Sequence, residues 1–213
     1  MGLSVPYLIL YNVVQYLGWT AFFVLFVINY ASTQDLQQTY DNTFYMVQFF
    51  QYLAILEIVH IILRLVRSPL FTTFVQVMSR VVIVFVLAKI KSSLSIGYVL
   101  LSLAWSITEM VRYTYYYLSL IKHNYITSFE LPYFLVWCRY SFFIVLYPIG
   151  VSGELITLWN STKELKNYAL GNITLAHLIY FAFVLYVPGL FMLYTYMLKQ
   201  RKSTLKKQKV KKL

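Results

Sequence analysis

Charged residues are scarce in this chain of 213 residues. They make up 12% of it, whereas soluble domains carry about 25%. Hydrophobic residues account for 60%, aromatic residues for 19%, and the mean hydropathy is +0.66. Such a small number of charges cannot cover the surface of a soluble domain. The composition therefore excludes a soluble protein and predicts one that crosses a membrane several times.

Cysteine is almost absent as well. Cys138 stands alone, which excludes an internal disulfide and a metal cage built from cysteines. A tyrosine-phosphatase site is also excluded, because it needs Cys-x5-Arg to hold phosphate beside a thiolate, and Ile144 occupies the arginine position. No further histidine or carboxylate lies at metal-ligand spacing beside His60, so we predict no metal site.

Acidic residues are the scarcer of the two charge types. The chain has 7 Asp and Glu against 18 Lys and Arg, a formal net charge of +11. Such an excess also occurs in nucleic-acid-binding proteins. Here, however, most basic residues flank apolar segments or lie in the terminal stretch KQRKSTLKKQKVKKL, where they would face anionic headgroups. We therefore predict membrane lipid, and no nucleic acid, as a partner.

Long apolar segments define the predicted architecture. A spanning helix needs about 20 mostly apolar residues. Six segments meet this requirement and are joined by short connectors: 8–28, 47–65, 70–88, 96–118, 132–153 and 175–198. The first lacks the basic start and cleavage site of a signal peptide, so we expect it to be retained. The prediction is an all-α bundle of about six transmembrane helices over residues 1–198, followed by a basic cytosolic tail over 199–213.

Basic residues also predict the orientation, because Lys and Arg in short loops stay in the cytosol. With both termini cytosolic, that side carries 11 basic residues and the opposite side 4, while three of the 18 lie within spans. The cytosolic set is the eight in the tail together with Arg64, Arg67 and Lys122. We therefore predict two cytosolic termini.

The end of the tail carries a candidate location signal. Lys209 and Lys211 are fifth and third from the end, and this spacing resembles the dilysine signal that returns membrane proteins to the endoplasmic reticulum. A basic tail that only touches lipid is the alternative.

Three carboxylates fall within or beside the predicted spans. A charge near the bilayer centre costs about 3 kcal/mol and marks a functional candidate. For Glu109 the structural interpretation is an ion pair with Arg112, three residues later on the same face. For Glu57, near His60, we likewise expect a structural role, with His60 as a hydrogen-bonding group.

Glu154, the third, closes the stretch VLYPIGVSGE, seven residues after Tyr147. A straight helix would separate the two by about 10 Å along its axis, too far for joint action on adjacent carbons. Pro148 removes a donor, and Gly150 and Gly153 permit bending, so the segment can shorten and expose unpaired N–H groups. From the residues alone, a simple kink and an active site are both open.

Several stretches together resemble a known family, the 3-hydroxyacyl-CoA dehydratases of very-long-chain fatty-acid elongation, also called protein-tyrosine-phosphatase-like membrane proteins. The similar stretches are LEIVHIILRLVRSPL, FVQVMSR, WSITEMVRYTYYY, RYSFFIVLYPIGVSGE and YVPGLFMLYTYMLKQRK. The resemblance implies six spans, location in the endoplasmic reticulum membrane, and catalysis by Tyr147 and Glu154.

The implied reaction dehydrates a long-chain or very-long-chain 3-hydroxyacyl-CoA to the trans-2-enoyl-CoA, the third step of the elongation cycle. It needs a base at C2, an acid at C3 and donors for an enolate-like oxygen, but no cofactor. We assign Glu154 as base and Tyr147 as acid, although the roles can be exchanged. Unpaired N–H groups from Gly150 to Gly153 are candidate oxyanion donors.

Further residues are predicted to assist. Those expected to support the site are Tyr140, Arg139, Glu109 and Arg112, and those expected to meet CoA phosphates are Arg64 and Arg67. The elongase and reductase of the cycle are the expected protein partners. A non-catalytic scaffold of the elongation machinery is the alternative function. A proton-coupled transporter fits less well, because it usually has two interrupted helices.

Overall fold

The computed structural model describes residues 4–170 and 173–210. The helices are α1 (Ser4–Thr33), α2 (Leu36–Leu53), α3 (Leu56–Ile62), α4 (Leu70–Lys89), α5 (Ile96–Asn124), α6 (Tyr133–Ser141), α7 (Phe143–Leu165) and α8 (Leu175–Val210). A 3-10 turn, Lys91–Ser93, precedes α5. Two short antiparallel strands, β1 (Ala169–Leu170) and β2 (Ile173–Thr174), connect α7 to α8.

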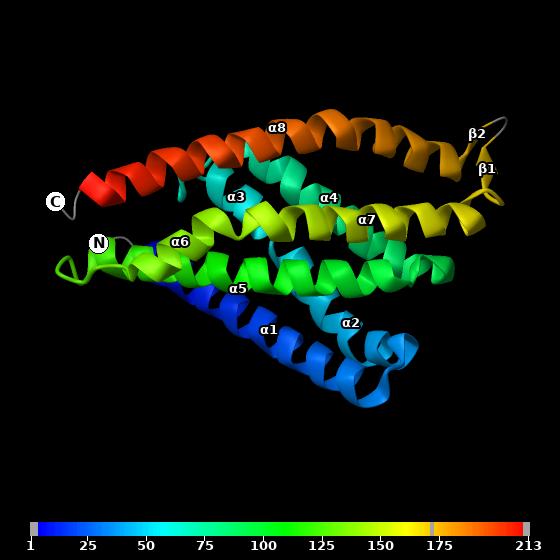
Figure 1. The fold of residues 1–213 in the computed structure, drawn as a ribbon, viewed down its shortest axis with the longest axis horizontal. Helices are drawn as coiled ribbons and strands as arrows, with labels where there is room; N and C mark the ends of the chain where they lie inside the picture. The colour runs from blue at the N-terminus through cyan, green and yellow to red at the C-terminus, as the bar shows by residue number, and fades with distance from the viewer. Residues whose placement is uncertain (1–3, 171–172, 211–213) are drawn as a thin grey trace.

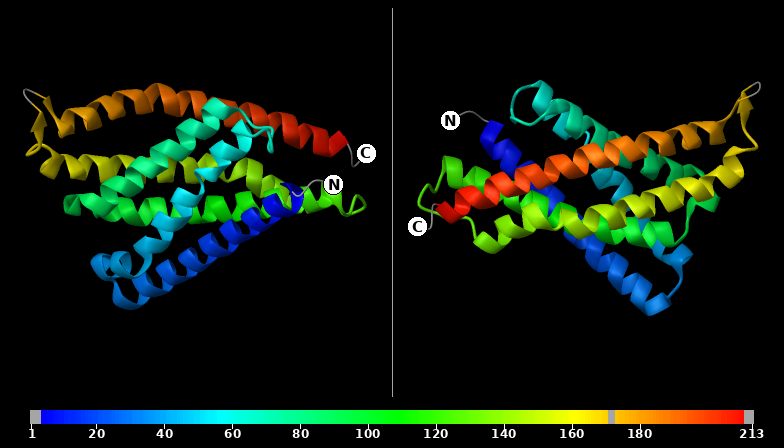
Figure 2. Two further views of the ribbon diagram at one scale, coloured as in Figure 1. Left: turned by 180° about the vertical axis from the view of Figure 1, so that it is seen from behind. Right: turned by 45° about the horizontal axis from the view of Figure 1, so that its top comes forward.

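The helices form one bundle around α5, which packs against both α1 and α7. In Figure 1, α1 lies on one side of α5 and α7 on the other, with α8 beyond α7. Figure 2 shows that α1 and α2 form a hairpin that diverges from the other helices toward its turn. The start of α1 and the end of α8 lie at the same end of the bundle (Figure 1).

Five segments are long and apolar enough to cross a membrane: Ser4–Thr33, Leu36–Ile62, Leu70–Lys89, Tyr133–Leu165 and Leu175–Lys206. The remaining predicted span, the fourth in the chain, is α5, a helix of 29 residues. It is less apolar because it carries Glu109, Arg112 and several tyrosines, and its central position keeps these charges away from lipid. The predicted helical membrane bundle is therefore confirmed, with the helix that carries Glu109 and Arg112 at its centre.

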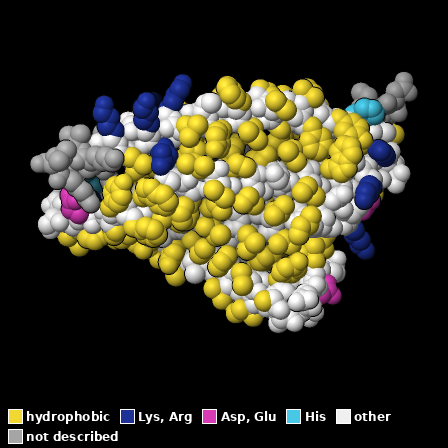
Figure 3. All heavy atoms as spheres, viewed as in Figure 1, with side chains coloured by type: hydrophobic (Ala, Val, Ile, Leu, Met, Phe, Trp, Pro, Cys, Tyr) yellow, Lys and Arg dark blue, Asp and Glu magenta, His cyan; other side chains and the backbone are white. Residues whose placement is uncertain are grey.

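The outer surface matches a bilayer. Figure 3 shows hydrophobic side chains over the middle of the visible face and basic side chains toward its two ends. Large apolar residues on the outside of the bundle are highly exposed, for example Val187 at 74% and Phe191 at 72%, both on α8. In water such exposure would be costly, whereas in lipid it is expected.

Several helices extend beyond the predicted spans. α2 begins at Leu36, because Asp35 caps it by accepting hydrogen bonds from the N–H groups of Gln37 and Gln38 at 2.8 and 3.1 Å. The fifth span runs on to Leu165, so Glu154 lies eleven residues before its end. α8 continues through Val210, past the predicted boundary between residues 198 and 199. The division into domain and tail stays a prediction.

The prediction of unpaired N–H groups from Gly150 to Gly153 is wrong. α7 is helical through Pro148, Gly150 and Gly153. Inside a helix each N–H group is paired with the carbonyl four residues earlier. The N–H groups of Gly150 and Gly153 are therefore not free to bind an oxyanion.

Gly153 instead allows α5 and α7 to approach closely. A Cβ atom added at Gly153 would lie 2.7 Å from both the carbonyl oxygen of Gly97 and the N atom of Leu101. A Cβ added at Gly97 would in turn lie 2.7 Å from the carbonyl oxygen of Gly153. Two backbones in such contact leave no room for a side chain, as at the small-residue interfaces of other membrane helices.

This packing predicts that alanine destabilises the protein at Gly153 but not at Gly150, although both glycines lie on α7. We expect Gly153→Ala to lower the free energy of unfolding by about 1–3 kcal/mol, because backbone atoms must move apart. Gly150→Ala is the matched control, because its added Cβ would meet the Ala104 Cβ at an ordinary 3.4 Å. The measurement is thermal unfolding of purified protein in detergent. Equal stability of the two variants would contradict the close-packing interpretation.

Candidate functional site

A cavity of about 620 Å³ runs inside the bundle. Its lining includes Ser68 in the connection between α3 and α4, Ser119 near the end of α5 and Gln200 in the second half of α8, and it also includes Glu154 and Tyr186. The end of α8 lies at the end of the bundle where both termini lie (Figure 1). The volume of the cavity is typical of ligand-binding pockets, about 300–1,000 Å³. The cavity therefore connects one end of the bundle with its buried carboxylates.

Glu154 is the carboxylate at the inner part of this cavity. It is 6% exposed. Its Oε1 atom accepts a hydrogen bond from Trp105 Nε1 at 3.0 Å, and its Oε2 atom accepts one from the Tyr186 hydroxyl at 2.9 Å. Among the described residues, no Lys or Arg lies within ion-pair distance of it. Three helices, α5, α7 and α8, thus hold one carboxylate with two neutral donors.

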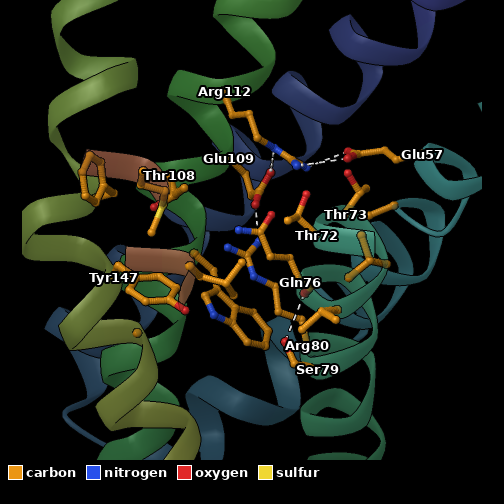
Figure 4. A pocket seen from close by; sticks show the side chains of 18 of the residues that line it. Glu57, Thr72, Thr73, Gln76, Ser79, Arg80, Thr108, Glu109, Arg112 and Tyr147 are labelled. Carbon is orange, nitrogen blue, oxygen red and sulfur yellow. Dashed lines mark hydrogen bonds and ion pairs between the residues drawn. The ribbon is translucent and has the colours of Figure 1, made fainter. Parts of the chain in front are cut away.

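Tyr147 lies about two helical turns before Glu154, so both side chains face the cavity from one side of α7. Figure 4 shows the Tyr147 ring projecting into the cavity. It stacks on the ring of Tyr194 with centroids 6.3 Å apart. Its hydroxyl makes no hydrogen bond within the described part of the chain, so it is free to meet a ligand.

A buried charge network lies beside these two residues and consists of Arg80, Glu109, Arg112 and Glu57. Arg80 pairs with Glu109, and Arg112 Nε lies 2.7 Å from Glu109 Oε2. Arg112 also donates two hydrogen bonds to Glu57, at 2.6 and 3.0 Å (Figure 4). The Tyr113 hydroxyl donates to Glu57 at 2.6 Å. The predicted pairing of Glu109 with Arg112 is confirmed, although the network is larger than the sequence indicated.

The network reaches Glu154 through an aromatic ring. The Arg80 guanidinium carbon lies 5.3 Å from the centre of the Trp105 ring, and Trp105 is the residue that donates to Glu154. A cation over an indole face is attracted by the ring. Arg80 therefore helps to fix the orientation of the indole that holds the carboxylate.

The other residues predicted to assist differ in whether they line the cavity. His60 Nε2 is hydrogen-bonded to the Tyr7 hydroxyl at 2.9 Å, as expected of a hydrogen-bonding group, and His60 also lines the cavity. Its structural role stays a prediction. Arg139 lines the cavity and donates to the Tyr116 hydroxyl at 3.0 Å. Tyr140 lies next to it, with the Arg139 guanidinium carbon 5.6 Å from its ring centre. Within the described residues, Tyr140 is not part of the cavity lining.

Arg64 and Arg67 lie in the exposed connection between α3 and α4. Neither is among the described residues that line the cavity, but their neighbours Val66 and Ser68 are. Their assignment to CoA phosphates stays a prediction about the rim.

Sequence reasoning did not single out Trp105 or Arg80 as site residues, and it also missed Tyr186. Tyr186 lies 32 residues after Glu154, on a different helix, so no local spacing connects the two. Two signals could have pointed to Tyr186. It begins the family-like stretch YVPGLFMLYTYMLKQRK, and a buried tyrosine hydroxyl needs a hydrogen-bond partner.

The fold and the site together define a helical membrane protein with a buried carboxylate and a tyrosine hydroxyl facing an internal cavity. Residues 51–207 match the family described as "Protein tyrosine phosphatase-like protein, PTPLA". The chain belongs to this family. The comparison with solved structures gave no match.

Relatives cover nearly the whole chain. One from Caenorhabditis elegans, named very-long-chain (3R)-3-hydroxyacyl-CoA dehydratase hpo-8, is 43% identical over 93% of this chain and 94% of its own. The human very-long-chain (3R)-3-hydroxyacyl-CoA dehydratase 2 is 37% identical over 95% of this chain and 82% of its own. A probable dehydratase of the same name from Schizosaccharomyces pombe is 33% identical over 96% and 95%.

Proposed function

We propose that this protein dehydrates long-chain and very-long-chain 3-hydroxyacyl-CoA to trans-2-enoyl-CoA, the third step of fatty-acid elongation. The observation that carries the proposal is a buried carboxylate, Glu154, and a free hydroxyl, Tyr147, facing one cavity in a chain whose relatives are named dehydratases. The cavity offers the separation from bulk water that such chemistry favours.

In the proposed reaction, C2 and C3 of the substrate lie in the cavity between the two groups. Because α7 is an unbroken helix, the backbones of Tyr147 and Glu154 are about 10 Å apart along its axis. The proposal therefore requires their side chains to close this separation, and Glu154 leans toward Tyr147 because side chains tilt toward the N-terminus of a helix. The Glu154 carboxylate removes the proton from C2, the C3–O bond breaks, and the Tyr147 hydroxyl gives its proton to the departing oxygen. A C2=C3 double bond forms and water leaves. The proton held by Glu154 then returns to the Tyr147 oxygen, which restores both groups without any cofactor.

The surrounding residues have supporting roles in this proposal. Trp105 and Tyr186 hold the two carboxylate oxygens of Glu154. The buried charge network, with Arg139, maintains the packing of the cavity walls. Arg64 and Arg67 would meet the phosphates of CoA at the rim, from the end of the bundle where both termini lie.

The cellular setting is also a proposal. We infer a location in the endoplasmic reticulum membrane with both termini cytosolic, beside the elongase and reductase of the cycle. The shared end of the two terminal helices and the excess of basic residues there support this orientation. Lys209 and Lys211, the candidate retrieval signal, have side chains outside the described residues.

The testing experiment supplies purified protein with a long-chain 3-hydroxyacyl-CoA. We expect the trans-2-enoyl-CoA to accumulate in proportion to enzyme concentration, because the chain carries both the base and the acid. Chromatography with mass detection measures the product. Absence of product from folded protein would favour the scaffold alternative.

A further inference from the structure

Helix α4 has two chemically different faces. Its outer face is apolar and exposed, at Phe71 (66%), Phe74 (48%) and Phe85 (57%). Its inner face lines the cavity with four uncharged polar side chains, which we call the α4 polar track: Thr72, Thr73, Gln76 and Ser79. Figure 4 shows these side chains along α4, with Arg80 following them.

The track has hydrogen-bonding capacity that the protein leaves unused. The hydroxyls of Thr72 and Thr73 donate to the carbonyl of Pro69, at 3.0 and 3.1 Å, and that of Ser79 donates to the carbonyl of Gln76, at 3.1 Å. The Thr73 hydroxyl also lies 3.4 Å from the Ser68 hydroxyl. The hydroxyls of Thr72 and Ser79 keep their acceptor lone pairs. The Gln76 side-chain amide makes no hydrogen bond within the described residues. None of the four side chains is buried, and Gln76 is exposed, so the track can hydrogen-bond a polar ligand or water in the cavity that it lines.

The wall formed by α8 is different. It contributes the apolar side chains of Ala182, Leu185, Leu190 and Leu193. Gly189 lies between them, and an added Cβ there would meet no atom within 4 Å. Apart from Tyr186, Tyr196 and Gln200, the lining side chains of α8 are apolar, whereas α4 contributes the polar track. The two walls together match a ligand with one polar and one apolar half.

We propose that the α4 polar track binds the pantetheine arm of the acyl-CoA, while the acyl chain lies against α8. This inference rests on the proposed function, which supplies the CoA thioester. The pantetheine arm carries two amide groups and a hydroxyl, which match the donors and acceptors of the track.

The position of the track agrees with this role. It begins one turn after the connection that holds Arg64 and Arg67, where the CoA phosphates would lie. It rises about 12 Å along the helix axis from Thr72 to Arg80. Arg80 is next to Trp105, which holds Glu154. The track thus leads from the rim of the bundle to the reacting groups.

The test uses two thioesters of the same 3-hydroxyacyl chain. One is the CoA thioester, and the other is the N-acetylcysteamine thioester, which keeps only the amide nearest the sulfur. The double variant Thr73→Val/Gln76→Leu removes polar atoms that would meet the distal part of the arm. We expect kcat/KM for the CoA thioester to fall about tenfold, mainly through KM, as for the loss of one or two buried hydrogen bonds. For the short thioester we expect little change.

The matched control is Thr114→Val on α5. The Thr114 hydroxyl donates to the carbonyl of Met110 in its own helix at 2.7 Å, and the residue is outside the described cavity lining. It should leave both thioesters unaffected. A parallel loss for both thioesters in the double variant would overturn the proposal, because it would indicate a structural role. Unchanged activity with the CoA thioester would overturn it too, because the track would then contact only water.

Affinity separates this inference from the proposed function. Binding of a saturated long-chain acyl-CoA, which cannot be dehydrated, is measured on the same variants. We expect the double variant to bind it about tenfold more weakly, with no such loss for the saturated N-acetylcysteamine thioester. If the unaltered protein shows no turnover, the proposed function fails, while this affinity comparison still supports or overturns the track.

Discussion

Glu154→Gln and Tyr147→Phe are each expected to lower turnover by about 10²-fold or more, the usual share of general acid–base catalysis. Gln keeps the shape of Glu154 and loses the charge that accepts a proton. Phe keeps the ring of Tyr147, and its missing hydroxyl has no partner within the described structure, so no internal contact is lost. Because the two groups act in one transition state, turnover of the double variant should be scarcely lower than that of the less active single variant.

The measurement is turnover per folded molecule with a long-chain 3-hydroxyacyl-CoA. Tyr194→Phe is the matched control, because Tyr194 stacks on Tyr147 but is outside the described lining of the cavity. Its activity should stay near normal. Near-normal turnover in Glu154→Gln and Tyr147→Phe would reject the acid–base assignment and place the scaffold alternative first.

Glu109→Gln is expected to have the largest effect on stability, a loss of about 3–5 kcal/mol in the free energy of unfolding. Glu109 is 2% exposed and is the carboxylate that pairs with Arg80 as well as with Arg112. Its neutralisation would leave Arg80 without a counter-charge and Arg112 with Glu57 alone. A buried unpaired charge is costly, because the protein interior solvates it poorly.

Glu130→Gln provides the control for this variant. Glu130 is 86% exposed and its pairing with Lys122 is long, at 3.7 Å, so its loss should cost less than about 1 kcal/mol. Thermal unfolding in detergent and turnover per folded molecule are measured together. Unchanged stability with abolished turnover would mean that Glu109 takes part in the chemistry.

Sequence reasoning succeeded where the controlling physics is local. The apolar segments predicted a helical membrane bundle because about 20 apolar residues suffice to cross a bilayer. The pairing of Glu109 with Arg112 was predictable because three residues bring two side chains to one helix face. Helix ends were less predictable: α7 and α8 continue well past the apolar segments that suggested them.

Contacts between distant helices could not be read from spacing. Arg80 meets Glu109 across 29 residues and Arg112 meets Glu57 across 55, and neither separation carries a period. The interpretation of Gly153 failed for the same reason. Its role is set by Gly97, on another helix, whereas the local sequence around Pro148 suggested only a bend.

The position of Tyr186 has a consequence for biosynthesis. Glu154 receives one of its two hydrogen bonds from α8, which follows the other helices of the cavity in the chain. A nascent chain that has inserted only as far as α7 therefore holds this carboxylate through Trp105 alone, with the cavity open on the side that α8 later covers. Completion of the cavity is thus coupled to the insertion of α8, and chains that lack this helix would lack an enclosed cavity around Glu154.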